Sequence, residues 1–429
     1  NLNCLFESCD AIPQPGCIYP NGFGLFNAEF GPEECTTYAG TPCGVFESDR
    51  YENKIFTEVT VTENVQYGAN IGIITQQPAL ENLFMDIYEP ENDNQTDRRV
   101  VVMLHTGSFL PAIANGQPTG DKTDFAIVEA CKNYARRGYV AVAVNYRLGW
   151  NPVSTSEDVR RSTLIQAAYR GLQDTKTAVR FLRKSAAEDG NPYGVGDKFA
   201  IGGYGTGGYL SLAVATLNDY ESELLMPKFI DSSQETIDAN GQPMPYIIQS
   251  VLGNFEATDF GMMPVDTTGD GVTDIQVPLC IPNHVGYSSE VDMVFNAGGA
   301  LPDISWLKAG EVPIASMQNL LDPDAPYGEG NVIVPTTGEF VIVAHGSKLI
   351  QEKTEDLNSV VENQELELNE DDSRKIVWQA KDFSIRAPGG GVGELITLSS
   401  SSKKKYVGKA LKSYFSMTLS GDPIFPKNQ

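Results

Sequence analysis

The segment that most constrains this chain is a glycine-dense turn between two apolar stretches. Residues 199–201 are apolar, five of the seven residues 202–208 are glycine, and apolar side chains then recur with helical spacing up to Leu217. Glycine permits backbone conformations and close approaches that other residues resist. The pattern predicts a buried strand, a sharp turn centred on Gly205 and a helix that leaves the turn.

Strand and helix patterns alternate along most of the chain. Apolar runs predict strands at residues 56–61, 83–90, 100–104, 139–144, 291–295, 312–317 and 340–343, and amphipathic spacing predicts helices at 125–137, 163–188 and 402–419. Such alternation is typical of a parallel sheet with right-handed crossovers. The expected fold class is therefore α/β, with a mostly parallel central sheet flanked by helices.

Composition sets the domain organisation and the expected surroundings. Residues 51–429 are interpreted as one domain, in which residues 219–290 form an insertion and residues 351–373 form an acidic stretch, either a solvated helix or a loop. The net charge of −25 argues against nucleic acid or an anionic membrane as partner. The chain begins with Asn1, so we expect a secreted protein that has lost a signal peptide, although an artificial start gives the same pattern.

The cysteines gather near the start of the chain. Five of the seven precede residue 44, and the full set is Cys4, Cys9, Cys17, Cys35, Cys43, Cys131 and Cys280. Their spacing matches no zinc pattern, so we expect disulfides in an oxidising compartment. Because five is odd, either one N-terminal cysteine pairs with Cys280 or one remains free, while Cys131 is expected as a buried thiol on an apolar helix face. Residues 1–50 are interpreted as a disulfide-tied arm, which wraps the main domain or reaches a neighbouring molecule.

Several motifs follow one another in a recognisable order. They are Met103–Phe109 (compare H-G-G-G-F), the R-G-Y…N-Y-R-L-G pattern at 137–149, the L-Q-D helix at 172–182, the G-x-G-x-G turn at 203–207 and the D-P-x-x-P-Y pattern at 322–327. Together they resemble the secreted α/β-hydrolase esterases of the carboxylesterase and acetyl-esterase type, over about residues 80–350. The turn resembles their nucleophile elbow, G-x-S-x-G. The resemblance implies the α/β-hydrolase fold and, in an intact member, a Ser–His–acid triad.

The triad positions are degenerate in this chain. The resemblance places Gly205 at the nucleophile position, and glycine cannot form an acyl-enzyme. Thr206 is a poor substitute, because the elbow presents only its central residue. Asp322 stands at the acid position, although the sequence before it departs from the family pattern. The base must follow the acid, and His345 is the only histidine that does; the alternative is an ordinary strand-end histidine.

The oxyanion loop is also altered. His105, Thr106 and Gly107 are its remnant, and Thr106 places a β-branched residue where close backbone approach is usual. Losing the nucleophile of a serine hydrolase costs about 10⁶ in kcat, and losing the base as well adds little. Glycine at position 205 also relieves backbone strain of about 1–3 kcal/mol. An engineered substitution at position 205 is an alternative explanation of the glycine, but it would not explain why the chain has no clear histidine base.

A second motif lies inside the insertion. Residues 266–274 resemble the D-x-D-x-D-G-x-x-D calcium loops of dockerin-like and thrombospondin-like repeats. The expected Ca²⁺ ligands are Asp266, Thr268, Asp270, the carbonyl group of Val272 and Asp274. The alternative is a simple acidic turn. No organic cofactor is expected.

The sequence thus predicts a secreted, catalytically inactive α/β-hydrolase homologue with a structural, adhesive or binding role. Its expected partner is another protein or a second copy of itself, in an oligomer or polymer, with no nucleic acid and no membrane span. The rival hypothesis is an active extracellular carboxylic-ester hydrolase with an atypical or engineered nucleophile site. A third hypothesis keeps the pocket as a site for small ligands.

Overall fold

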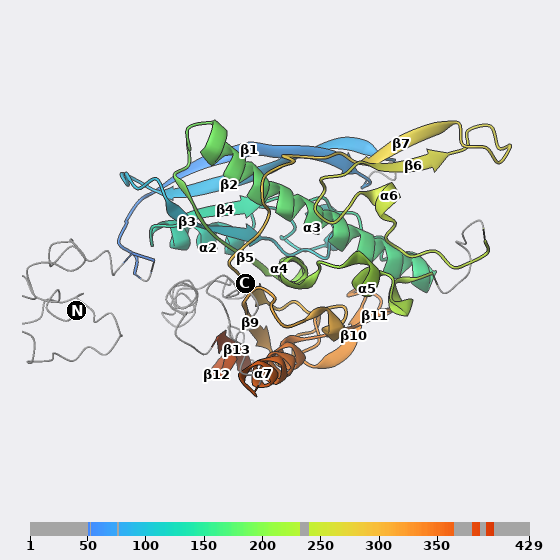
Figure 1. The fold of residues 1–429 in the computed structure, drawn as a ribbon. Helices are drawn as coiled ribbons and strands as arrows, with labels where there is room; N and C mark the ends of the chain where they lie inside the picture. Colours follow the sequence, from blue (N-terminus) through green and yellow to red (C-terminus); the bar gives the residue numbers. More distant parts are fainter. Residues whose placement is uncertain are drawn as a thin grey trace, which may run out of the picture.

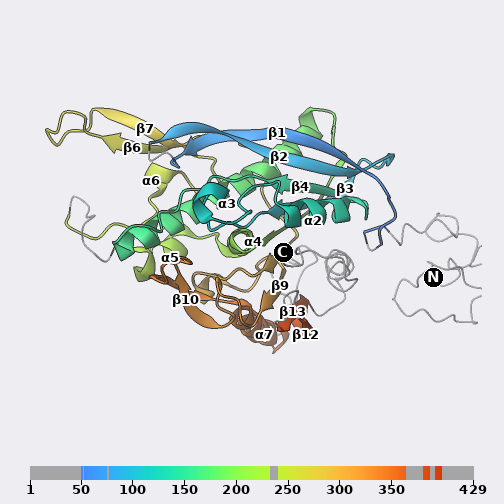
Figure 2. The same cartoon turned by 180° about the vertical axis from the view of Figure 1, so that it is seen from behind.

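A computed structural model describes residues 50–51, 53–74, 77–231, 240–363, 380–386 and 392–398 (Figures 1 and 2). The cysteine-rich arm up to residue 49, the expected helix at 402–419 and residues 364–373 of the acidic stretch lie outside the described residues. No helix in the described ranges combines the length and the apolar character needed to cross a membrane.

A nine-stranded sheet forms the centre of the molecule, in the order β1-β2-β4-β3-β5-β8-β9-β13-β12. The strands are β1 Val59–Gly72, β2 Ala79–Pro90, β3 Arg98–Leu104, β4 Val140–Val144, β5 Val195–Tyr204, β8 Met293–Ala297, β9 Ile314–Asn319, β12 Ala380–Arg386 and β13 Val392–Leu398. Strands β4, β3, β5, β8 and β9 are parallel neighbours, and the strands at both edges pair antiparallel. The predicted α/β fold with a parallel sheet centre is confirmed.

Helices cover both faces of the sheet (Figure 1). They are α1 Ala112–Asn115, α2 Phe125–Ala135, α3 Glu157–Glu188, α4 Thr206–Thr216, α5 Tyr220–Leu224, α6 Gln249–Leu252 and α7 Ser347–Asn363, with 3-10 turns η4 Pro227–Phe229 and η5 Ile304–Trp306. Alternate residues of β3 and β4 enter two cores, one with α2 and one with α3 and α4. Burial on both faces explains why β3 and β4 are nearly continuous apolar runs.

The local sequence explains the start of the long helix α3. The Ser156 hydroxyl accepts a hydrogen bond from the Val159 amide at 3.4 Å, and two acidic residues follow in the first turn. On the opposite core, Cys131 of α2 is fully buried, as predicted.

One expectation about the sheet is wrong, and two of its strands were not predicted. The apolar run at 340–343 was expected in the central sheet, but it belongs to β11 Phe340–His345, which pairs with β10 Glu329–Ile333 in a separate two-stranded sheet. Strands β12 and β13 were not predicted, yet they extend the central sheet beyond β9. Apolar alternation predicts a strand but does not indicate which other strand it pairs with, because any neighbouring strand with free backbone groups can pair with it.

The chain between α4 and β8 holds the residues interpreted as an insertion, 219–290. Its elements are α5, η4, α6, β6 Gly261–Val265 and β7 Ile275–Cys280. Strands β6 and β7 pair only with each other, so in the described part of the chain this segment adds no strand to the central sheet. Helix α7 occupies the beginning of the acidic stretch 351–373.

Candidate active site

The turn predicted around Gly205 joins β5 to α4 at the middle of the sheet. Gly205 has φ 52° and ψ −116°, a conformation that strains any residue with a side chain. Its amide donates to the Ala297 carbonyl group at 2.8 Å, which ties the turn to β8. A Cβ atom at Gly207 would overlap the Leu104 carbonyl oxygen. The turn therefore keeps the backbone shape of a nucleophile elbow.

The Thr106 side chain occupies the space in front of Gly205. A Cβ atom at position 205 would overlap the Thr106 hydroxyl oxygen and lie 3.1 Å from the Thr106 Cβ. Real Cβ atoms hardly ever approach other atoms so closely, so a serine at 205 would require the threonine to move. The two departures noted in the sequence, Gly205 and Thr106, are thus in direct contact.

The loop after β3 has an unusual backbone. Gly107, Ser108 and Phe109 have φ angles of 120°, 56° and 52°, although only the first is a glycine. A Cβ atom on Gly107 would lie 2.7 Å from the Gly120 Cα. The Asn115 side-chain amide donates to three carbonyl groups of this segment, at 2.8–3.2 Å. These contacts hold the loop in place despite its strain.

His105 supports this loop. Its ring is fully buried and stacks on Tyr146, with ring centroids 4.3 Å apart. Burial lowers the pKa of His105 to about 4, so the ring is neutral near pH 7. Its Nδ1 donates to the Thr106 carbonyl group at 2.7 Å. The Tyr146 hydroxyl donates to the His105 carbonyl group at 2.8 Å and lies 3.2 Å from the Thr206 hydroxyl, which is thereby engaged.

The acid and base candidates have separate partners. Asp322 follows β9, and its carboxylate accepts hydrogen bonds from the Asp324 and Ala325 amides at 2.9 and 3.0 Å. Burial raises the pKa of Asp322. His345 ends β11, its Nε2 lies 3.6 Å from the Glu329 carboxylate, and its Nδ1 has no hydrogen-bond partner among the described residues. No acid–base hydrogen bond joins Asp322 to His345 in the described part of the chain.

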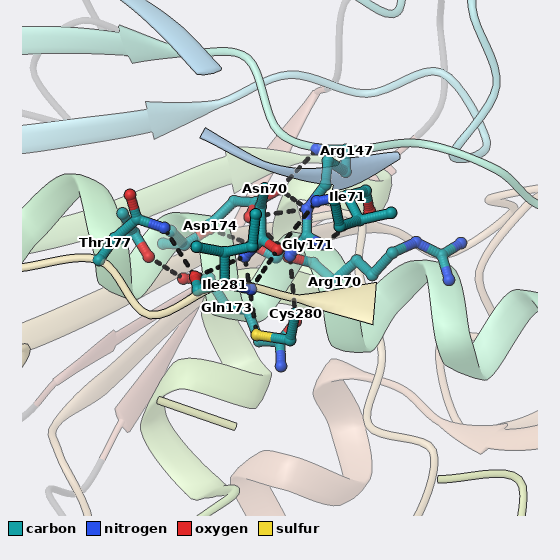
Figure 3. A network of polar contacts seen from close by, with 12 residues as sticks. Asn70, Ile71, Arg147, Arg170, Gly171, Gln173, Asp174, Thr177, Cys280 and Ile281 are labelled. Atoms are coloured by element: carbon teal, nitrogen blue, oxygen red, sulfur yellow. Dashed lines mark hydrogen bonds and ion pairs between the residues drawn. The ribbon is translucent and has the colours of Figure 1, made fainter. Parts of the chain in front are cut away.

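A buried ion pair links two of the motifs that resemble the esterases (Figure 3). Arg147 follows β4, Asp174 lies on α3, and both side chains have no exposed surface. The Arg147 amide and guanidinium donate to the Asp174 carboxylate at 2.7–3.0 Å. The guanidinium also donates to the Ile71 carbonyl group and the Gln173 side chain, each at 3.0 Å. The sequence patterns did not lead us to predict this structural role. The available signal was a pair of oppositely charged residues in two segments that are otherwise expected to be buried.

The same network reaches residues 219–290. The Gln173 amide donates to the carbonyl groups of Leu252 and Asn254 at 2.9 and 2.8 Å. The Asn70 amide lies 3.7 Å from the Cys280 sulfur (Figure 3). Cys280 is buried and free among the described residues, and burial raises the pKa of its thiol. The five N-terminal cysteines lie outside the described residues, so the disulfides remain a prediction.

The expected calcium ligands belong to the loop that joins β6 to β7. Asp266 accepts hydrogen bonds from the Thr268, Gly269 and Gly271 amides, and the last two lower its pKa most. Asp274 accepts from the hydroxyl and amide of Thr267, which lower its pKa. The described residues hold no group of three or more His, Cys, Asp or Glu side chains arranged for a metal ion. Calcium binding at Asp266, Thr268, Asp270, Val272 and Asp274 therefore stays a prediction.

Comparison with known proteins places the chain beside esterases. Residues 85–280, slightly less than half of the chain, match the model of the BD-FAE family. The matched stretch includes the loop after β3 and the elbow, and it ends before Asp322 and His345. No curated protein matches the chain.

Some solved structures are similar to the chain. A truncated carbohydrate esterase from gut microbiota is 13% identical, with 71% of this chain and 85% of that chain covered and a TM-score of 0.38. A thermophilic esterase from the Planctomycetes species Thermogutta terrifontis is 18% identical, with 65% and 76% covered and a TM-score of 0.33. A bifunctional GH43-CE protein of Bacteroides eggerthii is 18% identical, with 56% and 23% covered and a TM-score of 0.30.

Proposed function

We propose that this homologue of the BD-FAE esterase family is catalytically inactive and serves as a secreted structural, adhesive or binding protein. The observation that carries the proposal is the contact between Gly205 and Thr106. The elbow tip has no side chain, and the threonine hydroxyl lies where the Cβ atom of a nucleophile would be. A chain that still cleaved esters at this turn would need that space.

The surroundings of the elbow support the same proposal. A neutral, buried His105 packs into the loop, and His345 faces Glu329 instead of bonding to Asp322. A serine hydrolase without its nucleophile and base retains a rate enhancement of at most about 10³–10⁴ over the uncatalysed reaction, which comes from its oxyanion hole and substrate binding. That remaining rate enhancement is too small for a useful esterase.

The competing function is an active ester hydrolase. It is favoured by the preserved elbow backbone and by Asp322, which keeps its place after β9. Hydrolysis of short-chain p-nitrophenyl esters, combined with fluorophosphonate labelling, decides between the two. We expect neither turnover above buffer nor labelling. Turnover that disappears in Thr206→Val would identify Thr206 as the nucleophile and overturn the proposal.

Binding is expected to use protein surfaces instead of an acyl pocket. The candidate surfaces are the disulfide-tied arm 1–50, residues 219–290 and the acidic stretch 351–373, with another protein or a second copy as partner. Light scattering at increasing concentration tests self-association, and thermal-shift screening with acyl esters tests a retained ligand site. A strict monomer at high concentration would remove self-association from the proposal.

Calcium at residues 266–274 is an independent part of the proposal. The donor set of carboxylate, hydroxyl and carbonyl oxygens suits Ca²⁺. Asp266 and Asp274 are exposed, and the lowered pKa of each keeps its carboxylate charged at neutral pH. Calcium would then fix the tip of the hairpin without any role at the elbow.

A further inference from the structure

Two buried carboxylates lie where residues 219–290 leave the central domain. Glu223 belongs to α5, the first helix after α4, and Glu311 belongs to the loop just before β9. The exposed fractions of the two residues are 1% and 8%. Acidic side chains are rarely buried to this extent unless a cation or several hydrogen-bond donors compensate their charge.

The Glu223 carboxylate has a full set of partners. It accepts hydrogen bonds from the backbone amides of Asn218 and Asp219, each at 2.8 Å, and it forms an ion pair with Lys308. The Trp306 indole donates to the Glu223 carbonyl group at 3.0 Å, which ties α5 to η5. The lysine and the two amides of this cluster therefore serve the first carboxylate.

The Glu311 carboxylate has much less support. The side-chain amide of Asn218 donates to both of its oxygens, at 3.0 and 3.1 Å. In the described ranges no ion pair joins Glu311 to a cation. The charged groups that face it are Glu223 from α5 and Lys308 from the segment after η5, whereas α4 and β9 contain no charged residue. One lysine is thus shared by two buried carboxylates.

We propose that Glu311 and α5 form a pH-sensitive latch, which holds the start of residues 219–290 on the central domain while Glu311 is protonated and releases it when Glu311 is ionised. The chemical change is the loss of one proton to water or buffer. An ionised Glu311 adds a second buried negative charge, which repels Glu223 and becomes hydrated when the contact opens. Because residues 219–290 are a candidate binding surface, the latch makes the presentation of that surface depend on pH. This inference goes beyond the proposed function, since it holds whether or not the elbow is active.

The pH window follows from the pKa of Glu311 in the closed and open states. Burial raises the pKa of Glu311 to about 7 against the hydrogen bond from Asn218, and repulsion by Glu223 adds to the rise. Opening returns the group to water, where the ordinary pKa of 4.5 applies. The closed latch is therefore most stable below about pH 4.5, its opening constant rises between pH 4.5 and 7, and the constant is level at higher pH.

Hydrogen exchange of the full chain, measured by mass spectrometry, tests the latch. We expect the protection of the α5 amides, corrected for the intrinsic pH dependence of exchange, to fall by about tenfold or more between pH 5 and 7. The amides of α2, in the other core, are the internal reference and should lose much less protection. Protection of α5 that does not change with pH, or an equal loss in α2, would overturn the proposal.

A matched pair of variants then tests Glu311 itself. Glu311→Gln keeps the shape of the side chain without its charge, and Glu221→Gln removes an exposed carboxylate from α5 as the control. We expect α5 to stay protected from pH 5 to 8 in Glu311→Gln and to keep the native pH response in Glu221→Gln. A native response in Glu311→Gln, or its loss in Glu221→Gln, would assign the effect to another group and refute the latch. Circular dichroism checks that both variants fold, and the native profile is decisive by itself if one of them does not.

Discussion

A serine at position 205 should destabilise the protein, and the amount should depend on Thr106. The φ of 52° and ψ of −116° at this position suit glycine, and a residue with a Cβ atom pays about 1–3 kcal/mol to adopt such a conformation. The new Cβ also overlaps the Thr106 hydroxyl. Displacing that side chain from its rotamer adds about 0.5–1.5 kcal/mol.

These terms predict the result of a double-mutant cycle. Gly205→Ser alone should lower the free energy of unfolding by about 1.5–4.5 kcal/mol, but by only about 1–3 kcal/mol in a Thr106→Gly background. The difference, a coupling of about 1 kcal/mol, is measurable by urea denaturation of the four proteins. Gly205→Ala is the matched control and should show the same coupling, because the overlap belongs to the Cβ atom.

Two results would contradict this reasoning. Additivity within about 0.5 kcal/mol would mean that Thr106 does not occupy the space in front of residue 205. Recovery of ester hydrolysis in Gly205→Ser/Thr106→Gly would mean that a competent base exists, although His345 has Glu329 as its neighbour. We expect coupling in stability and no recovery of turnover.

Other predictions concern groups away from the elbow. Glu311 is buried and accepts hydrogen bonds from Asn218, and burial raises its pKa to about 7. The folded state then holds a proton that the unfolded state loses near pH 4.5, so stability should fall by up to about 3 kcal/mol as the pH rises from 4.5 to 7. Glu311→Gln should abolish this slope in denaturation experiments at several pH values, and an unchanged slope would exclude Glu311 as its source. Asp174→Asn should lower the free energy of unfolding in urea by about 3–5 kcal/mol, because it leaves the buried Arg147 without its charged partner. Replacing both residues by methionine should lower it less, and a larger loss in the double variant would contradict this. Calcium should raise the melting temperature of the native chain and not that of Asp266→Asn, as calorimetry can check; equal shifts would place the ion elsewhere.

Much of the fold could be predicted from residue patterns. Strands β3, β4 and β5 and helices α2 and α3 lie where apolar periodicity places them, because burial on a sheet face requires that periodicity. The pairing of β11 with β10, and the addition of β13 beside β9, could not be read in this way. Strand partners depend on which backbone edges the folded chain brings together.

The same distinction between sequence and tertiary structure applies to the candidate site. The sequence alone determined that residue 205 is a glycine, which has no nucleophilic side chain, and that His345 is the only histidine after Asp322, because these are facts of residue identity and order. The tertiary structure alone decided that Thr106 fills the space before Gly205, that His345 faces Glu329, and that Arg147 and Asp174 are buried together. Those relations depend on distances between segments far apart in the chain, which spacing along the sequence does not specify.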